Sequence, residues 1–170
     1  MRHPHRMPLK QSEGFTIMEL LTTLAVVGIL AGIAVPSFYT TQQSMRVTAD
    51  TNKFYGLIHY ARSAASKTQK SVTLCPEDGQ WAKGVYTTFG DCSGTPGSLP
   101  DRRTLTFDDQ VVVDAAWSAD GLTFMPSGAV TSSLAISPIR IGGTSPSVAS
   151  RQVTLTATGT AKIERLGVGS

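Results

Sequence analysis

Apolar residues fill the stretch from Phe15 to Val35, which contains a single charged side chain, Glu19. A helix needs about 20 apolar residues to cross a bilayer, and this run has that length. A polar leader precedes the run and ends at Ser12–Gly14. In a secretory signal peptide the apolar part is shorter and lies before the cleavage site. The pattern therefore predicts cleavage after Gly14 and a membrane-spanning helix that stays with the mature chain.

A second apolar pattern follows Pro36, with steps of three and four residues that are typical of an amphipathic helix. Lys53, Arg62 and Lys67 fall outside the apolar stripe. One helix of about 50 residues is expected, bent at the proline and ending near Thr68. The residues of the stripe are Phe54, Leu57, Ile58, Ala61, Ala64 and Ala65.

From residue 71 onward, short runs alternate between apolar and polar side chains, as strands do. Turn-rich loops are expected at Ser93–Asp101 and Gly142–Ser150. The order of elements predicts an α+β fold in which a long helix packs against an antiparallel sheet. The expected strands are Ser71–Cys75, Val85–Phe89, Leu105–Phe107, Val111–Val113, Leu122–Met125, Leu134–Ile141, Val153–Ala157 and Ala161–Leu166.

Charge is distributed unevenly along the chain. The leader holds three basic residues and Glu13, so it supplies +2 of the formal net charge of +3. A basic leader keeps the N-terminus in the cytoplasm under the positive-inside rule. Residues 37–70 carry +4, residues 71–120 carry −5 and residues 121–170 carry +3. Such segments are either solvated faces that offset one another or complementary docking faces between stacked subunits.

The chain contains two cysteines, Cys75 and Cys92. A domain exported beyond the inner membrane meets an oxidising compartment. A bridge between the two cysteines would close a loop of about 18 residues, which contributes about 3 kcal/mol in the chain-entropy model. A zinc site needs four ligands, and His59 is the single histidine outside the leader. A structural disulfide is expected, with no metal.

The sequence offers little for catalysis. His3 and His5 belong to the leader, which leaves His59 alone for a catalytic triad. Asp108 and Asp109 are adjacent in an expected turn, a poor geometry for paired acid–base chemistry. Nucleotide-binding glycine patterns do not occur. We expect a protein that is not an enzyme and uses no cofactor.

The run Gly14-Phe15-Thr16-Ile17-Met18-Glu19 resembles the type III signal of type IV pilins and pseudopilins. That resemblance implies a prepilin peptidase that cuts between Gly14 and Phe15, N-methylation of Phe15, and Glu19 as the assembly glutamate. Pro36 matches the proline that bends the long helix in that superfamily.

Glu19 has two possible roles. A charge in the bilayer core costs at least about 2.5–3.5 kcal/mol, so it is rarely placed there without a partner. Glu19 either lies at the level of the lipid headgroups or neutralises the terminal amine of Phe15 on a neighbouring subunit. The second interpretation would set the register between parallel helices.

Stretches within the head narrow the resemblance to the GspH/FimT family of minor pilins. Residues 60–67, Val72–Pro76 and Trp81–Val85 resemble that family, and Leu122–Gly128 is similar to its phenylalanine-and-glycine hairpin. The same residues also suit ordinary structural positions, with Trp81 in the core and Gly84 in a tight turn. The resemblance spans nearly the whole mature chain.

Members of this family that serve DNA uptake carry a C-terminal Gly-Arg-x-Arg pattern. The aligned stretch here reads Gly159-Thr160-Ala161-Lys162, so threonine and lysine replace the two arginines. Lysine binds phosphate as a point charge without the bidentate fork of arginine. Double-stranded DNA is a candidate partner, unless these cations only protect strand edges from pairing. The candidate contacts are Arg140, Arg151, Lys162 and Arg165.

The predicted organisation is a cleaved leader at 1–14, a transmembrane and assembly half-helix at 15–36, an amphipathic half-helix at 37–70 and a β-rich head at 71–170. The expected function is that of a minor type IV pilin, with other major and minor pilins as partners. It would cross the bacterial inner membrane once, with its head in the periplasm, and then join a cell-surface pilus. One alternative is a minor pseudopilin, of the H type, in a type II secretion system. Another is a membrane-anchored binding domain that never polymerises.

Overall fold

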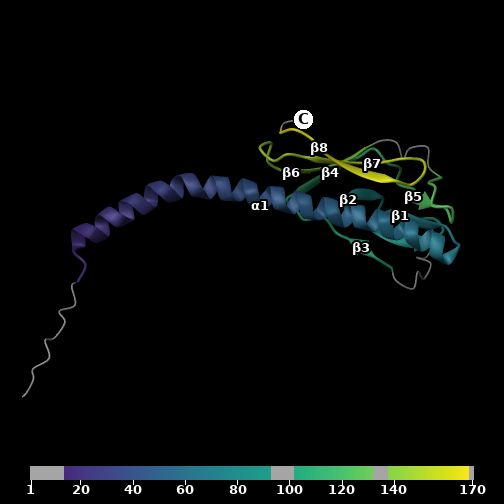
Figure 1. The fold of residues 1–170 in the computed structure, drawn as a ribbon, viewed down its shortest axis with the longest axis horizontal. Helices are drawn as coiled ribbons and strands as arrows, with labels where there is room; N and C mark the ends of the chain where they lie inside the picture. Colours follow the sequence, from purple (N-terminus) through teal and green to yellow (C-terminus); the bar gives the residue numbers. More distant parts are fainter. Residues whose placement is uncertain (1–13, 93–101, 132–137, 169–170) are drawn as a thin grey trace, which may run out of the picture. The chain divides into compact units, whose positions relative to one another are not determined.

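The computed structural model describes residues 14–92, 102–131 and 138–168, except for the side chain of Pro36. The described chain contains one long helix and two groups of short strands (Figure 1). The elements are α1 (Ile17–Thr68), β1 (Val72–Glu77), β2 (Gln80–Phe89), β3 (Thr104–Leu105), β4 (Val111–Ala115), β5 (Leu122–Phe124), β6 (Ile139–Gly143), β7 (Arg151–Leu155) and β8 (Ala161–Arg165).

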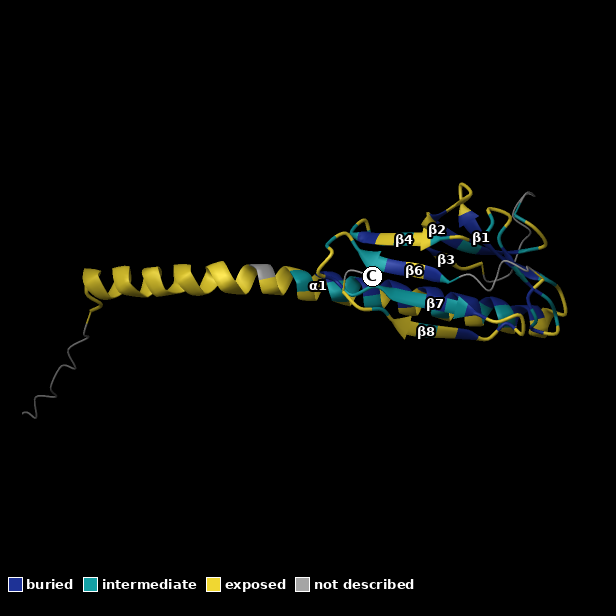
Figure 2. Ribbon diagram, turned by 90° about the horizontal axis from the view of Figure 1, so that it is seen from above, coloured by how far each residue is buried: buried dark blue, intermediate teal, exposed yellow. Residues whose placement is uncertain are grey.

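The chain divides into two units, residues 1–38 and residues 39–170. In the first unit every described side chain is exposed (Figure 2). Among the described residues, α1 is the helix that is long and apolar enough to cross a membrane. The helix continues through Pro36, and the bend expected there stays a prediction.

In the second unit, which we call the head, the apolar stripe of α1 faces the core as predicted. Phe54, Ile58 and Ala61 are fully buried, whereas Lys53 is exposed. The helix ends at Thr68, where it was expected to end. The next residue, Gln69, adopts a left-handed conformation with φ of 54°, which is a common way to terminate a helix.

The strands form two four-stranded antiparallel sheets, which the alternation pattern alone did not specify. One sheet has the order β3-β2-β1-β5 and the other has the order β4-β6-β7-β8 (Figure 1). The chain changes sheets between β3, which pairs with β2, and β4, which pairs with β6. The predicted α+β class, a long helix packed on antiparallel strands, is confirmed.

An aromatic cluster occupies the core between α1 and the sheets. The ring centroid of Phe54 lies 6.5 Å from the ring centroid of Trp81 and 6.1 Å from the ring centroids of Phe107 and Trp117. Trp81 donates a hydrogen bond from Nε1 to the carbonyl of Ser118 at 3.1 Å, so its polar atom is satisfied. The predicted burial of Trp81 is confirmed. Every buried apolar residue of the described chain lies between positions 47 and 161, so the head has a core of its own.

Several strand boundaries differ from the prediction. β1 runs past Pro76, where the pairing register shifts at a bulge, and bulges are places where sheets tolerate proline. β6 includes Gly142 and Gly143, so the expected loop begins at Thr144, and its Val148 is buried. The loop expected at Ser93–Asp101 lies outside the described residues. So does most of the part of the strand expected at Leu134–Ile141 that precedes β6.

Candidate functional site

The N-terminus of α1 is capped by Thr16, a residue within the pilin-like signal. The hydroxyl of Thr16 accepts a hydrogen bond from the backbone N–H of Glu19 at 3.2 Å. Thr-x-x-Glu is the sequence signature of a capping box, and a carboxylate in the first turn also interacts favourably with the helix dipole. Thr16 therefore caps the helix through the backbone of Glu19, and the Glu19 carboxylate lies in the first turn. The Thr-x-x-Glu spacing could have revealed this cap from sequence.

The second sheet separates the four candidate DNA-binding cations into two pairs. Arg140 in β6 and Lys162 in β8 are exposed and belong to one face of the sheet. Arg151 in β7 and Arg165 in β8 are direct cross-strand partners and belong to the opposite face. Because side chains alternate between faces along a strand, the four do not form one cationic surface.

Neighbouring carboxylates offset the positive charge of Arg140 and Lys162. Lys162 Nζ lies 2.7 Å from Glu164 Oε1, and this hydrogen bond raises the pKa of Lys162. Asp114 stands directly opposite Arg140 in the β4–β6 pairing. This face therefore carries mixed charge and offers few uncompensated cations for a phosphate backbone.

The other pair has a different environment. Arg151 is half-buried, and Arg165 is exposed at the rim of a groove beside α1. Like charges in directly opposed strand positions repel each other. Among the described residues, neither guanidinium forms an ion pair with a carboxylate. These two arginines are the pair of predicted cations that the structure brings together.

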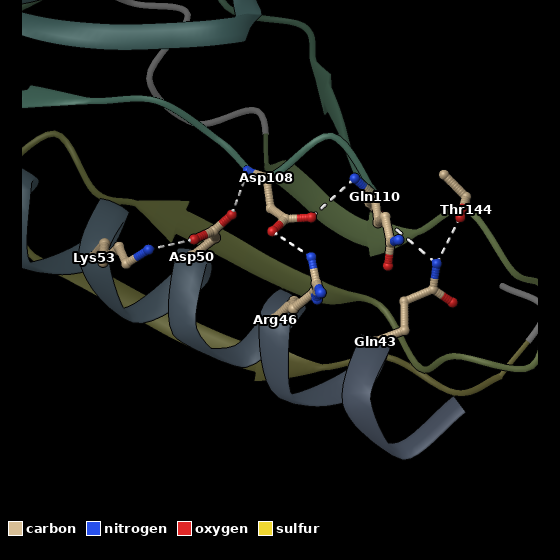
Figure 3. A network of polar contacts seen from close by, with 7 residues as sticks. All are labelled: Gln43, Arg46, Asp50, Lys53, Asp108, Gln110 and Thr144. Atoms are coloured by element: carbon tan, nitrogen blue, oxygen red, sulfur yellow. Dashed lines mark hydrogen bonds and ion pairs between the residues drawn. The ribbon is translucent and has the colours of Figure 1, made fainter. Parts of the chain in front are cut away.

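A polar network on α1, which the sequence reasoning missed, fastens the segment between β3 and β4 to the helix (Figure 3). Arg46 Nη1 donates to Asp108 Oδ2 at 2.7 Å, and the backbone N–H of Gln110 donates to Asp108 Oδ1 at 3.0 Å. The backbone N–H of Asp108 in turn donates to Asp50 Oδ2 at 2.8 Å, and Lys53 Nζ lies 2.8 Å from Asp50 Oδ1.

The network has an electrostatic consequence at Asp108. The hydrogen bond from the Gln110 backbone is the largest effect and lowers the pKa of Asp108. Desolvation opposes it, and the nearby Arg46 guanidinium lowers the pKa further. The side chain of Asp50 is only 3% exposed, so its two partners are what make its burial tolerable. The spacing of Arg46, Asp50 and Lys53, three and four residues apart, is the sequence signal for a shared polar face.

The predicted disulfide is present between Cys75 and Cys92, whose Cα atoms are 5.5 Å apart. Cys75 is fully buried in β1, and Cys92 follows β2. The bridge ties the end of β2 and the start of the following loop to the centre of the first sheet. Gly121 lies against it, since a Cβ there would meet both Cys92 Sγ and the carbonyl of Leu74.

Residues relevant to catalysis or metal binding are dispersed. In the part of the chain that the structure describes, no three residues among histidine, cysteine, aspartate and glutamate gather closely enough to hold a metal ion. His59 is exposed and packs against the Tyr55 ring, with the two ring centres 4.4 Å apart. Asp108 serves the network described above.

These features define a pilin-like protein, with an exposed apolar half-helix and a head in which α1 packs on antiparallel sheets. Two crystal structures of the type IV minor pilin FimU from Pseudomonas aeruginosa PAO1 share this fold. Their TM-scores are 0.53 and 0.57 at 15% and 14% sequence identity, and the matches cover 72% and 73% of this chain and 99% and 95% of theirs.

The family follows from sequence. A family model described as "Type II transport protein GspH" matches residues 50–159, and the chain belongs to this family. It is also 33% identical over 88 residues to a "Fimbrial protein" of Pseudomonas aeruginosa. That match covers 51% of this chain and 57% of its relative, so the chain spans little more than half the length of the curated relative.

Proposed function

We propose that the protein is a minor pilin, a structural subunit of a type IV pilus with no catalytic role. The observation that carries this proposal is the combination of an exposed apolar helix containing Glu19 with a head of the GspH family. The exposed half-helix has no intramolecular partner in the described chain, which suits a segment that packs in a membrane and then among neighbouring helices. The FimU fold and the fimbrial relative support the same role.

The proposal includes maturation and location. A prepilin peptidase cuts between Gly14 and Phe15, and Phe15 is N-methylated. The mature subunit crosses the bacterial inner membrane once with its head in the periplasm, and it then joins a surface pilus beside other major and minor pilins. In the assembled helices, Glu19 neutralises the terminal amine of a neighbouring subunit.

A minor pseudopilin of a type II secretion system is the second candidate, and the description of the matching family model favours it. The same stalk and head serve both assemblies. A pilus subunit would be recovered in filaments sheared from the cell surface. A pseudopilin would stay in the cell envelope, and its deletion would block the release of folded exoproteins.

Duplex DNA stays a predicted ligand of this pilin. Fewer than four cations support DNA binding, because Arg140 and Lys162 stand beside carboxylates on one face of the sheet. Affinity for duplex DNA depends on the number of phosphates that a protein neutralises, with a salt slope of about −0.9 per contact. Two arginines, Arg151 and Arg165, would give a shallow slope and weak binding per subunit.

The test of the assembly role compares Glu19→Gln with Glu164→Gln in the full-length protein expressed in its host. Glu19→Gln should keep its membrane level but fall at least about tenfold in sheared filaments, because a buried amine without its carboxylate is costly. Glu164→Gln, which removes a carboxylate from the head, should assemble like the wild type. Normal assembly of Glu19→Gln would refute the register role of the glutamate.

Mass spectrometry of the mature N-terminus tests maturation separately. A methylated Phe15 as the first residue is the expected result. An intact Gly14–Phe15 bond in the membrane-bound protein would instead support an anchored domain that never polymerises.

A further inference from the structure

The head carries a groove beside the N-terminal part of its helix. The groove has a volume of about 640 Å³ and lies between α1, the β6–β7 loop and the segment that follows β8. Met45 and Val168 at its rim are 66% and 63% exposed, which is unusual for large apolar side chains of the head. The lining residues are Thr40, Thr41, Ser44, Met45, Thr48, Ala49, Asn52, Ser147, Val148, Ala149, Arg165 and Val168.

The chemistry of the groove is amphipathic. Its helix side presents Thr41, Met45 and Thr48, which share one face because they are four and three residues apart. The lining combines hydroxyl groups with apolar side chains, of which Val148 is buried and Met45 and Val168 are largely exposed. Arg165 is the charged residue of the lining, and no carboxylate belongs to the described lining.

Arg151 adds a second guanidinium at the same end of the second sheet. It is the direct cross-strand partner of Arg165, on the face of the sheet that contributes Val153 and Ile163 to the packing against α1. Arg151 is not itself among the lining residues, but the strand pairing places it next to Arg165, and neither arginine has a carboxylate partner among the described residues. Such a pair at the groove favours an anion. A phosphodiester has the charge and the acceptor oxygens for that position.

We propose that this groove binds the headgroup of an anionic phospholipid, with the phosphate at Arg151 and Arg165. The glycerol lies along the helix side of the groove, beside Ser44 and Thr48. The upper acyl-chain carbons lie against Met45 and Val168. The ligand class is a glycerophospholipid with net negative charge, such as phosphatidylglycerol.

Position and charge favour a lipid over a soluble anion. The groove begins at Thr40, and the apolar run that precedes it on the same helix ends at Val35. Basic residues close to a membrane-spanning helix attract anionic headgroups. Arg165 in the lining and its cross-strand neighbour Arg151 supply the positive charge at this end of the second sheet, and no carboxylate belongs to the described lining. The groove therefore complements an anionic headgroup.

This inference rests on the proposed membrane anchoring. It adds a form of the subunit, before assembly, in which the head contacts the bilayer. Bound headgroups would hold the head against the bilayer while the subunit waits in the membrane. Extraction into a filament would then have to release the contact. Because the helix tethers the head at the surface, a weak intrinsic affinity is sufficient.

The experiment uses residues 39–170, which contain a core of their own, and measures co-sedimentation with vesicles at low and moderate ionic strength. One vesicle set contains equal parts of phosphatidylglycerol and phosphatidylcholine, and the other contains phosphatidylcholine alone. We expect salt-sensitive binding to the first set only. The Arg151→Ala/Arg165→Ala variant should bind about 30-fold more weakly, since each basic residue near an anionic surface contributes roughly fivefold.

The matched control is Arg140→Ala/Lys162→Ala, which removes the same charge from the same sheet but from its opposite face. It should bind vesicles within about twofold of the wild type, and unfolding temperatures should show that both variants are folded. No binding to the anionic vesicles at low salt would overturn the proposal, as would equal losses in the two variants. Complete displacement by millimolar glycerol phosphate would assign the site to a free phosphate.

A further arm replaces the vesicles with a short DNA duplex. Tighter binding to the duplex than to anionic vesicles, lost in Arg151→Ala/Arg165→Ala, would assign the arginine pair to DNA and overturn the lipid site. A failed vesicle experiment would leave the proposed assembly role intact, because that role is tested by the level of Glu19→Gln in sheared filaments. Conversely, a failed filament experiment would leave vesicle binding by the isolated head unchanged.

Discussion

Gly159 in the β7–β8 turn packs directly against the carbonyl oxygen of Gly128 in the turn after β5, so closely that a Cβ on Gly159 would overlap it. Both glycines have positive φ, +77° at Gly159 and +81° at Gly128. A hydrogen bond of 3.0 Å from the N–H of Val130 to the carbonyl of Ala157 joins the same two turns. The turns belong to different sheets, so this contact holds the sheets together at one end of the head.

Gly159→Ala should therefore destabilise the head by more than the usual cost of a left-handed alanine. Backbone strain of this kind costs of the order of 1–3 kcal/mol, and the clash with Gly128 adds to it because a carbonyl cannot move aside as a flexible side chain can. Urea unfolding of residues 39–170 measures the difference. The matched control is Gly90→Ala, which has φ of +79° but no atom within 4 Å of the added Cβ. Equal losses in the two variants would show that the contact between the turns contributes nothing.

The contact also shows what the sequence reveals about this head. Gly128 and Gly159 stand out in their motifs, but nothing in either motif indicates that the two turns meet. The helix stripe and most strand positions follow from local periodicity, since each element buries its own apolar face. The division into two sheets depends instead on which edge β4 joins after Leu105, a long-range choice that the alternation of side chains does not encode.

Pairing that the sequence does not reveal also shapes the candidate site. Arg151 and Arg165 lie close in sequence, in consecutive strands, but the register of β7 against β8 is what makes them direct neighbours. A shift of β8 by one residue against β7 would have moved Arg165 to the face of the sheet opposite Arg151. Likewise, the spacing of Arg46 and Asp50 marks a polar helix face, but its partner Asp108 comes from a segment whose path over α1 is set by the sheets.

The Arg46–Asp108 contact predicts acid sensitivity. The pKa of Asp108 is lowered in the folded head, mainly by the Gln110 N–H, so the unfolded chain takes up this proton at higher pH than the folded chain. The stabilisation is fully present above the ordinary aspartate pKa of about 3.9, and it is lost as the pH falls through the lower folded value. Asp108→Asn should lower the unfolding temperature at neutral pH, and the gap to the wild type should narrow below about pH 4.

A carboxylate in a more exposed ion pair provides the control for that titration. Asp78 lies 3.0 Å from Lys83, and its side chain is 72% exposed, so solvent screens the pair. Asp78→Asn should follow the wild-type unfolding temperature at every pH. A gap between Asp108→Asn and the wild type that stays constant down to pH 2 would mean that the asparagine perturbs packing and that ionisation of Asp108 contributes nothing.

The Cys75–Cys92 bridge should account for a measurable share of head stability. With 17 residues of sequence separation, the chain-entropy model assigns it about 3 kcal/mol. For a domain of this size, that loss corresponds to a decrease of about 10 °C in unfolding temperature. Scanning calorimetry with and without reductant measures the decrease. The Cys75→Ala/Cys92→Ala variant is the control, because reductant should leave its unfolding temperature unchanged.

Phe54 should be the most costly side chain of α1 to truncate, because it joins the helix to the aromatic cluster. It is fully buried and contacts Trp81, Phe107 and Trp117, which come from β2 and from the segments flanking β4. Phe→Ala changes in cores typically cost 3–5 kcal/mol, since they remove buried area and leave a cavity that rigid neighbours cannot fill.

Urea unfolding of Phe54→Ala in residues 39–170 should show that loss as a lower midpoint at unchanged slope. Met45→Ala removes a large apolar side chain from the same helix at a position that is 66% exposed, and it should stay within about 0.5 kcal/mol of the wild type. A Phe54→Ala loss as small as that of Met45→Ala would mean that the helix is held to the sheets mainly by other contacts. The polar network of Arg46 and Asp50 with Asp108 would then be the first of these to examine.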